Sequence, residues 1–219
     1  MAKLKVHAVI VSILMIGSAI LGGVNRQTYT DITSDSDFLH TFSVAEVPAA
    51  IAAEDCRFMK ESLPKSSYIL DIIPEDAPRS IFADRQQKVK IESVYNGNDL
   101  APGDMIWLTS AHWKIYPSEK TIDTGFVNDM KEGSSYLVFL SGQVGMTEDG
   151  EPVYAISSGD HINAIFLRGS CNNTFYPTAG ESTYVPYAEV KDNEFFAADQ
   201  EGLDAYFALK NDMLDAYNS

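Results

Sequence analysis

A run of strand-like segments across residues 87–157 limits what this chain can fold into more than any other feature of its sequence. At the start of the run, residues 87–95 alternate between apolar and polar side chains, so that Val89 and Ile91 fall on the same side. A period of two is typical of a strand with one buried face. Asn96-Gly97 follows, a pair that tolerates positive φ and favours a turn. The run therefore begins with a half-buried strand that ends in a turn.

Further segments of this kind lie on both sides of that strand. Residues 136–140 are apolar throughout and rich in β-formers, which indicates a central strand covered on both faces. Residues 111–132, before this strand, read as an irregular excursion. We expect the remaining strands at residues 68–73, 105–110, 153–156 and 164–167. Five to six short strands with varied loops are typical of a small closed or nearly closed barrel.

Two motifs in these segments resemble a known group of proteins. Residues 89–106 read V-x-I-x-x-V-Y-N-G-x-x-L-x-x-G-D-x-I, and residues 133–140 read G-x-x-Y-L-V-F-L. Both patterns resemble bacterial exported proteins that contain a netrin-like, TIMP-like OB barrel. The resemblance extends over residues 67–167, about half of the chain. It implies a mainly β fold of the α+β class, an OB-like barrel with flanking helices.

The same resemblance raises the idea of metallopeptidase inhibition. In the tissue inhibitors, the mature chain begins with a cysteine whose amine and carbonyl groups chelate the zinc of the enzyme. Here the first cysteine is Cys56, and the dense disulfide set of those inhibitors is absent. The resemblance therefore carries the fold to this chain and not the inhibitory function.

The N-terminal residues indicate export from the cytoplasm. Lys3 and Lys5 precede a nearly continuous apolar run, residues 6–24, which is close to the length needed to cross a bilayer as a helix. Gly17-Ser-Ala19 would serve as a signal-peptide cleavage site, whereas the continuation of the run favours a retained anchor. Both readings predict an extracytoplasmic protein, either secreted or membrane-anchored through a transmembrane helix, with no other membrane contact.

We divide the rest of the chain by composition. The C-terminal helix is expected to dock on the barrel through one apolar stripe, with the stem of Lys210 among its members. That stripe comprises Leu203, Tyr206, Phe207, Met213, Leu214 and Tyr217. The expected segments are a polar spacer at 25–42, an N-terminal helical segment at 43–66, the OB-like barrel at 67–170, an irregular segment at 171–195 and the C-terminal helix at 196–219.

The charge balance excludes some partners. The chain has 31 acidic and 16 basic residues, a formal net charge of −15. A surface this acidic repels phosphate backbones, so we expect no nucleic-acid partner. It also disfavours docking on anionic lipid. A protein or cell-envelope partner is the remaining expectation.

Cys56 and Cys171 are the only cysteines in the chain. Outside the cytoplasm, two cysteines favour a disulfide, and we predict that these two are bonded. The alternative is a pair of separate thiols. A catalytic thiol is disfavoured, because no partner base is marked in the sequence.

The excursion at 111–132 holds the candidate binding residues. Aromatic side chains in a loop can form a recognition surface, and OB-type barrels often bind through such loops. We therefore take His112, Trp113 and Tyr116 as candidate ligand- or partner-binding residues. The alternative is that Trp113 and Ile115 fold back to plug the barrel.

Motifs for catalysis and metal binding are missing. The sequence contains no H-E-x-x-H, C-x-x-C, G-x-S-x-G or Walker pattern, and its histidines are widely spaced. We predict no metal site, no cofactor and no catalytic residue. The expected function is a non-enzymatic binding or interaction module at the bacterial cell surface. The alternatives are a hydrolase whose acidic residues come from distant positions and a structural component of an envelope assembly.

Overall fold

The computed structural model describes residues 39–81, 84–176 and 183–218. The predicted export segment at 1–24 and nearly all of the spacer at 25–42 lie outside these residues. In the part of the chain that is described, every helix is too short or too polar to cross a membrane. The prediction of a transmembrane helix therefore has no support, and the segment that suggested it, residues 6–24, is not among the described residues.

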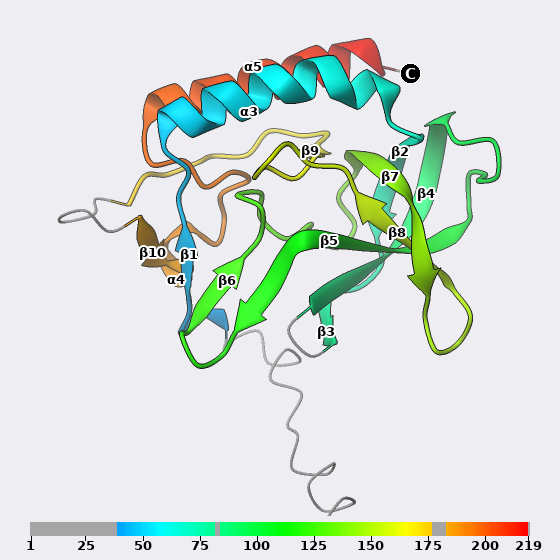
Figure 1. The fold of residues 1–219 in the computed structure, drawn as a ribbon, viewed down its shortest axis with the longest axis horizontal. Coiled ribbons are helices and arrows are strands. Elements are labelled where there is room, and N and C mark those ends of the chain that lie inside the picture. Colours follow the sequence, from blue (N-terminus) through cyan, green and yellow to red (C-terminus); the bar gives the residue numbers. More distant parts are fainter. Residues whose placement is uncertain (1–38, 82–83, 177–182, 219) are drawn as a thin grey trace, which may run out of the picture. The chain divides into compact units, whose positions relative to one another are not determined.

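A closed five-stranded barrel forms the centre of the fold, which confirms the predicted OB-like, mainly β architecture (Figure 1). Neighbouring strands pair in the order β2–β4–β5–β8–β7, and β7 returns to β2 to close the barrel. All of these pairs are antiparallel except β5 and β8, which are parallel. The barrel strands are β2 (Tyr68–Pro74), β4 (Asp84–Asn96), β5 (Met105–Tyr116), β7 (Tyr136–Met146) and β8 (Pro152–Ile156).

The hydrophobic pattern explains the barrel. Val89 and Ile91 of β4 are buried, as the period of two predicted, and Lys90 between them is exposed. The first half of β7, residues 136–140, is buried on both faces, which agrees with its continuous apolar run. One core of apolar side chains fills the barrel and the layer beneath the two long helices.

Short strands extend the barrel sheet beyond β5. Strand β6 (Thr121–Asp123) pairs with β5, β1 (Ser43–Ala45) pairs with β6, and β10 (Tyr184–Pro186) forms the outer edge. A second, smaller core lies against this extension, and Ile115 and Ile122 belong to it. The remaining short strands are β3 (Arg79–Ile81), which pairs with β4, and β9 (Ile165–Leu167), which pairs with β7.

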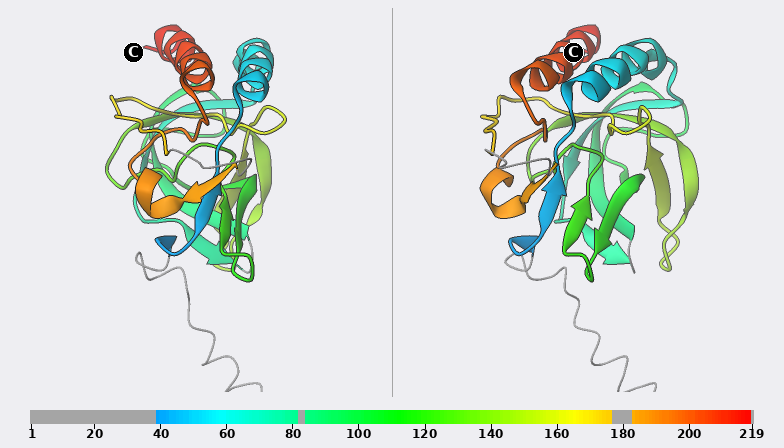
Figure 2. Two further views of the ribbon diagram at one scale, coloured as in Figure 1. Left: turned by 90° about the vertical axis from the view of Figure 1, so that its left-hand side faces the viewer. Right: turned by 60° about the vertical axis from the view of Figure 1, so that its left-hand side comes forward.

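Two long helices run side by side across one end of the barrel (Figures 1 and 2). They are α3 (Ala49–Ser62), which is continued by the short 3₁₀ helix η1 (Leu63–Lys65), and α5 (Gln200–Ala216). The predicted docking of the C-terminal helix is confirmed: the Tyr206 ring stacks on Phe195 at 4.1 Å, and its hydroxyl donates to the Ile165 carbonyl at 2.8 Å. A single short turn, α4 (Tyr187–Val190), follows β10.

Two expected boundaries differ from the structure. Residues 43–45, which we placed in a helical segment, form strand β1, and α3 begins only after Pro48. The excursion at 111–132 is not irregular throughout: β5 continues to Tyr116 and returns as β6. The physical reason is the alternation of Trp113 and Ile115 with polar neighbours, which extends the strand beyond residue 110.

The predicted disulfide is wrong. Cys56 and Cys171 are both free. Cys56 is buried on the inner side of α3, where burial raises the pKa of its thiol to about 12. Cys171 lies in the segment that follows β9 and hydrogen-bonds the Asp192 carbonyl at 2.9 Å. The Cys56 thiol is therefore buried beneath α3, the Cys171 thiol binds the Asp192 carbonyl, and no disulfide joins them.

Candidate functional site

The β5–β6 hairpin forms one wall of a pocket on the surface of the barrel. Its two strands pair Tyr116 with Thr121 and Lys114 with Asp123. The turn between them, residues 117–120, ends at Lys120, whose φ of 52° is that of a left-handed residue closing a hairpin loop. This geometry directs alternate residues of both strands to the solvent side, while their neighbours enter the second core.

The structure separates the three predicted binding residues. His112 and Tyr116 both line the pocket. Trp113 points the other way and is fully buried in the main core, so its selection as a binding residue is wrong. Adjacent residues of a strand face opposite sides, and the Trp113 side chain belongs to the apolar set. The alternative that Trp113 folds inward is the one that the structure shows.

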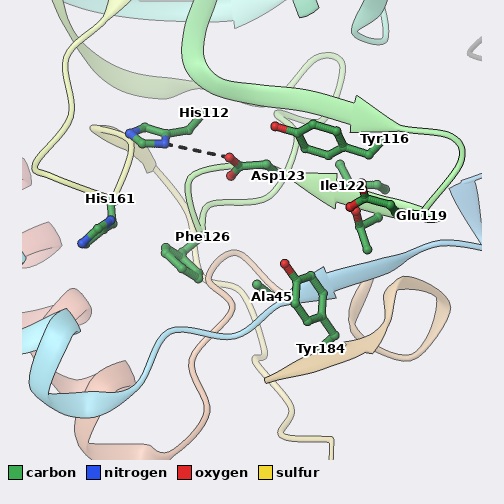
Figure 3. A pocket seen from close by; sticks show the side chains of 10 residues that line it. Ala45, His112, Tyr116, Glu119, Ile122, Asp123, Phe126, His161 and Tyr184 are labelled. Carbon is green, nitrogen blue, oxygen red and sulfur yellow. Dashed lines mark ion pairs between the residues drawn. The ribbon is translucent and has the colours of Figure 1, made fainter. Parts of the chain in front are cut away.

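The pocket has a volume of about 380 Å³ and is open to solvent. Figure 3 shows side chains from several elements converging on it, with the His112 ring on the same side as His161. We call it the His112 pocket. Its lining residues are Ala45, His112, Tyr116, Glu119, Thr121, Ile122, Asp123, Phe126, His161 and Tyr184.

The loop that carries Phe126 is held in an unusual backbone conformation. Gly125 and Phe126 have φ values of 62° and 57°, and an aromatic residue rarely adopts the left-handed region. At Gly125 a Cβ atom would lie 2.5 Å from the Asn163 amide nitrogen, so no larger residue fits there. The Asn163 side chain donates to the Thr124 carbonyl at 2.8 Å, and its backbone N–H donates to the Gly125 carbonyl at 3.0 Å. Asn163 therefore fixes this loop from behind.

The same asparagine connects to the β5 wall. The Ser110 hydroxyl donates to the Asn163 side-chain oxygen at 2.6 Å and accepts the His112 backbone N–H at 3.1 Å. Asn163 is fully buried and Ser110 is 5% exposed. One buried network thus positions the backbone of both His112 and the Phe126 loop.

A buried carboxylate on helix α3 orders the loop that carries His161. Asp55 accepts three backbone N–H groups, from Asp160 at 2.7 Å, His161 at 2.9 Å and Ile162 at 2.8 Å. Its side chain is only 4% exposed. At Gly159 a Cβ atom would lie 2.4 Å from an Asp55 oxygen, so glycine allows this close approach. Three charge-assisted hydrogen bonds at one carboxylate give the loop a defined position.

Asp123 is the carboxylate at the centre of the hairpin wall. One oxygen accepts the Gly125 backbone N–H at 3.0 Å, and the other lies 3.9 Å from His112 Nδ1, the pair drawn in Figure 3. That distance is too long for a hydrogen bond, so Asp123 does not fix the His112 ring as a catalytic dyad does. Lys114, which shares this face of the strand, instead pairs with Asp84 at 3.0 Å. The hydrogen bond and the charge of Asp84 raise the Lys114 pKa.

The lining offers few groups for nucleophilic chemistry. Neither serine nor cysteine is among the described residues that line the pocket, so a hydroxyl nucleophile from this set would have to be Thr121 or a tyrosine. Among the described residues there is no group of three or more potential metal ligands that could hold an ion. What remains is a set of aromatic, imidazole and carboxylate groups facing a shared volume.

The described structure has further hollows, including two whose linings differ from that of the His112 pocket. One of about 200 Å³ is lined by Cys171, Tyr136 and Glu194 among others, and burial is the main cause that raises the Cys171 pKa. A raised pKa disfavours the reactive thiolate. The other, a shallow groove of about 480 Å³, runs beside Phe58 and Lys65 and is otherwise rich in serine. Buried side chains also bind backbone at the Cys171 hollow, where Asn128 donates to the Asn193 carbonyl at 2.7 Å. That hollow has about half the volume of the His112 pocket.

Most residues of the His112 pocket were not predicted from the sequence. Glu119, Asp123 and Phe126 lie in or just after the same hairpin as His112 and Tyr116, whereas only the fold brings His161 and Tyr184 to them. One local signal was available for part of the set. Residues 114–116 and 121–123 each place an isoleucine between polar or amphipathic residues, and four turn-like residues separate them, a pattern typical of a hairpin.

Comparison with known proteins identifies no relative: no family model matches the chain, and neither does any curated protein.

Proposed function

We propose that this protein is a non-enzymatic binding module that works outside the cytoplasm and takes its ligand in the His112 pocket. The choice of this pocket gives the expected binding function a specific location. It keeps His112 and Tyr116 as binding residues and adds residues that the fold brings beside them.

The observation that carries the proposal is the set of buried polar groups behind the pocket. Asp55, Asn163 and Ser110 are nearly or fully buried, and each one binds backbone of a loop or strand that presents a lining residue. Burying polar groups costs free energy unless each is paired, and an apolar core would avoid that cost. A functional reason to accept this cost is that the buried groups order the pocket wall in advance, because a rigid site loses less conformational entropy when a ligand binds.

The Phe126 loop supports the same conclusion. A left-handed φ at a bulky residue is unfavourable by about 1 kcal/mol or more, and such strain is most common at ligand-binding and catalytic sites. Here the strained residue lines the pocket. The backbone conformation therefore serves to place the Phe126 side chain at the site.

The hydrolase alternative has two observations in its favour, the carboxylates of Glu119 and Asp123 in one pocket and the approach of His112 to Asp123. We place it second, because His112 and Asp123 are 3.9 Å apart and Glu119 is exposed in the hairpin turn. The proposal of an extracytoplasmic location draws on the sequence, where Lys3 and Lys5 precede the apolar run at 6–24.

An NMR titration tests whether the His112 pocket binds ligands. The isotope-labelled full-length chain is titrated with small compounds from four classes: cationic, anionic, sugar-like and aromatic. We expect at least one class to shift the backbone amides of Asp123, Phe126 and His161 in a saturable way. Tyr116→Ala should weaken that binding, whereas Val144→Ala, at a side chain that is 60% exposed on β7, should not.

Two results would overturn the proposal. In one, no class of compound shifts the pocket amides. In the other, saturable binding maps to a different place, such as the groove beside Phe58 and Lys65. Release of a reaction product from any compound during the titration would instead favour the hydrolase alternative.

A further inference from the structure

The charged groups that line the His112 pocket are acidic or are imidazoles. Among the described lining residues, Glu119 and Asp123 are the carboxylates, and there is neither lysine nor arginine. Glu119 lies in the hairpin turn and is exposed, and Asp123 is half-buried on β6. A group that enters the pocket therefore meets negative charge on the hairpin side.

Aromatic rings make up much of the remaining wall. Tyr116 comes from β5, Phe126 from the strained loop and Tyr184 from β10. Figure 3 shows the Tyr116 ring beside the hairpin and the Tyr184 ring on the opposite strand pair. Tyr116 is 37% exposed and Tyr184 is 51% exposed, so both have surface that a ligand can contact. Aromatic faces attract cations, and the attraction is stronger where a carboxylate is also near.

The ammonium group of Lys114 is an internal cation that would compete with a cationic ligand for the Asp123 carboxylate. Lys114 pairs across the hairpin with Asp123 in register, so both side chains start from the same face of the sheet. Its ammonium group, however, is held by Asp84 at 3.0 Å on the opposite neighbouring strand, β4. Asp84 thus binds the Lys114 ammonium group, and the charge of Asp123 acts on Lys114 more weakly than that of Asp84.

We infer that the ligand of the His112 pocket carries an alkylammonium or guanidinium group, which sits between the carboxylates of Glu119 and Asp123 and the rings of Tyr116, Phe126 and Tyr184. This inference rests on the proposed binding function and specifies its ligand class. The same chemistry occurs in small free amines and in the lysine or arginine side chains of a basic protein. The net charge of −15 would speed the approach of either one.

The direct test compares matched probes with the full-length protein. The cationic probes are Nα-acetyl-lysine methylamide and Nα-acetyl-arginine methylamide, and the neutral control is the norleucine analogue, which keeps the alkyl chain without the charge. We expect both cationic probes to shift the amides of Asp123 and Phe126, with affinity that falls as salt is added. The norleucine analogue should bind at least tenfold more weakly.

Variants locate the charge that is responsible. The double variant Glu119→Gln with Asp123→Asn should weaken binding of the cationic probes about tenfold. A matched control, Glu148→Gln with Asp149→Asn, removes the same two charges from the exposed β7–β8 turn and should change the affinity less than twofold. Lys114→Met should strengthen binding, because it removes the internal cation closest to Asp123 in the strand register.

A third arm distinguishes the two sources of the cation. Putrescine represents a free amine, and a short peptide with alternating lysine and glycine represents a basic segment of a partner. Tighter binding of the peptide than of the single amino-acid probes would assign the site to a protein partner. Equal or tighter binding of putrescine would assign it to small amines.

The outcomes separate this inference from the function on which it rests. If an anionic or sugar-like compound binds the pocket and the cationic probes do not, the binding function stands and the cationic ligand class is overturned. Equal binding of the norleucine analogue and the lysine probe would also overturn the ligand class. If no compound of any class reaches the pocket, the binding function itself fails.

Discussion

Buried polar groups behave differently in two regions of this molecule. Behind the His112 pocket, Asp55 and Asn163 bind backbone groups of the loops that present the lining residues. Beneath helix α5, a buried cation and a buried carboxylate also pair with each other: Lys210 meets Glu194 at 2.6 Å, and both side chains are about 5% exposed. The first arrangement orders the backbone around ionisable side chains that face solvent. In the second, the opposite charges of Lys210 and Glu194 offset each other.

The contrast extends to the rest of the α5 region. Arg168 contacts the Asp71 carboxylate on β2 and donates to the Tyr217 carbonyl at 2.6 Å, which ties the end of α5 to the barrel. Glu194 also accepts the Leu167 backbone N–H at 3.0 Å. A fully paired region of this kind fixes the position of a helix. Behind the pocket, buried polar groups instead hold the backbone of loops whose side chains line an open cavity, and this difference can be measured.

The largest effect is expected from breaking the pair beneath α5. Lys210→Met leaves the Glu194 carboxylate buried without its cation, which should lower the free energy of unfolding by about 3–5 kcal/mol. Urea denaturation followed by circular dichroism measures the change. Adding Glu194→Gln to this variant removes the unpaired charge and should restore part of the loss. If the free energy of unfolding of Lys210→Met alone is within 1 kcal/mol of that of the natural protein, the buried pair does not stabilise the α5 region.

A smaller loss is expected behind the pocket. Asp55→Asn weakens three hydrogen bonds to the His161 loop and should cost about 2 kcal/mol. It should also speed hydrogen exchange at the amides of Asp160 and His161 while exchange beneath α5 stays unchanged. Glu54→Gln, at the exposed neighbouring position, is the control and should do neither. Equal exchange changes in both regions would remove the distinction between them.

Glu46, which follows the strand that carries Ala45 of the pocket, gives a pH-dependent effect. Burial raises the pKa of this carboxyl to about 7, and a hydrogen bond from the Tyr176 backbone N–H acts in the opposite direction. Between about pH 4.5 and 7 the unfolded chain loses this proton first, so the group lowers stability as the pH rises. Glu46→Gln should therefore be more stable than the natural protein above pH 7, by about 1 kcal/mol.

Thermal unfolding across pH 4 to 8 measures this effect. The difference between Glu46→Gln and the natural protein should vanish near pH 4, where the carboxyl is protonated in both states. Glu148→Gln, at an exposed position, removes the same charge without the burial and serves as the control. A variant that is less stable than the natural protein at pH 8 would show that the Glu46 carboxylate has a stabilising partner.

The smallest effect concerns the link between the two regions. Cys56 lies on α3, and Cys171 lines the cavity beside Glu194, so a disulfide would have joined them covalently. Because both are free, adding a reductant should shift the melting temperature by less than about 1 °C, whereas losing a disulfide across such a long loop would cost about 4 kcal/mol. Thiol titration of the unfolded chain without reductant should find two thiols. If the titration finds no free thiol, Cys56 and Cys171 are joined by a disulfide.

Local patterns predicted much of the fold. The alternation around Val89 and Ile91, the apolar run at 136–140 and the stripe of the C-terminal helix all appear in the structure where they were expected. These signals depend on neighbours in the sequence, which is why they can be read without a structure. The prediction that residues 111–132 form an irregular excursion was wrong. The alternation through Trp113 and Ile115 is also a local strand pattern, and it continues β5 to Tyr116.

The candidate site was predictable only in part. His112 and Tyr116 were chosen because aromatic loops of barrels bind ligands, and both line the pocket. Trp113 was chosen by the same argument and is in the core, because composition alone does not tell which face of a strand a residue occupies. His161 and Asp55 carried no local signal, since their roles depend on contacts across more than a hundred residues.

The sequence alone determined much of the local structure of this protein: most of the barrel strands, the C-terminal helix and its apolar stripe, and the excess of acidic residues. These properties follow from side-chain chemistry at a spacing of two to four residues. Only the tertiary structure decided which elements meet. It closed the barrel, left the two cysteines without a disulfide and brought a carboxylate on α3 to the loop of His161. Such pairings depend on how whole faces pack, and no local pattern encodes the partner of a given face.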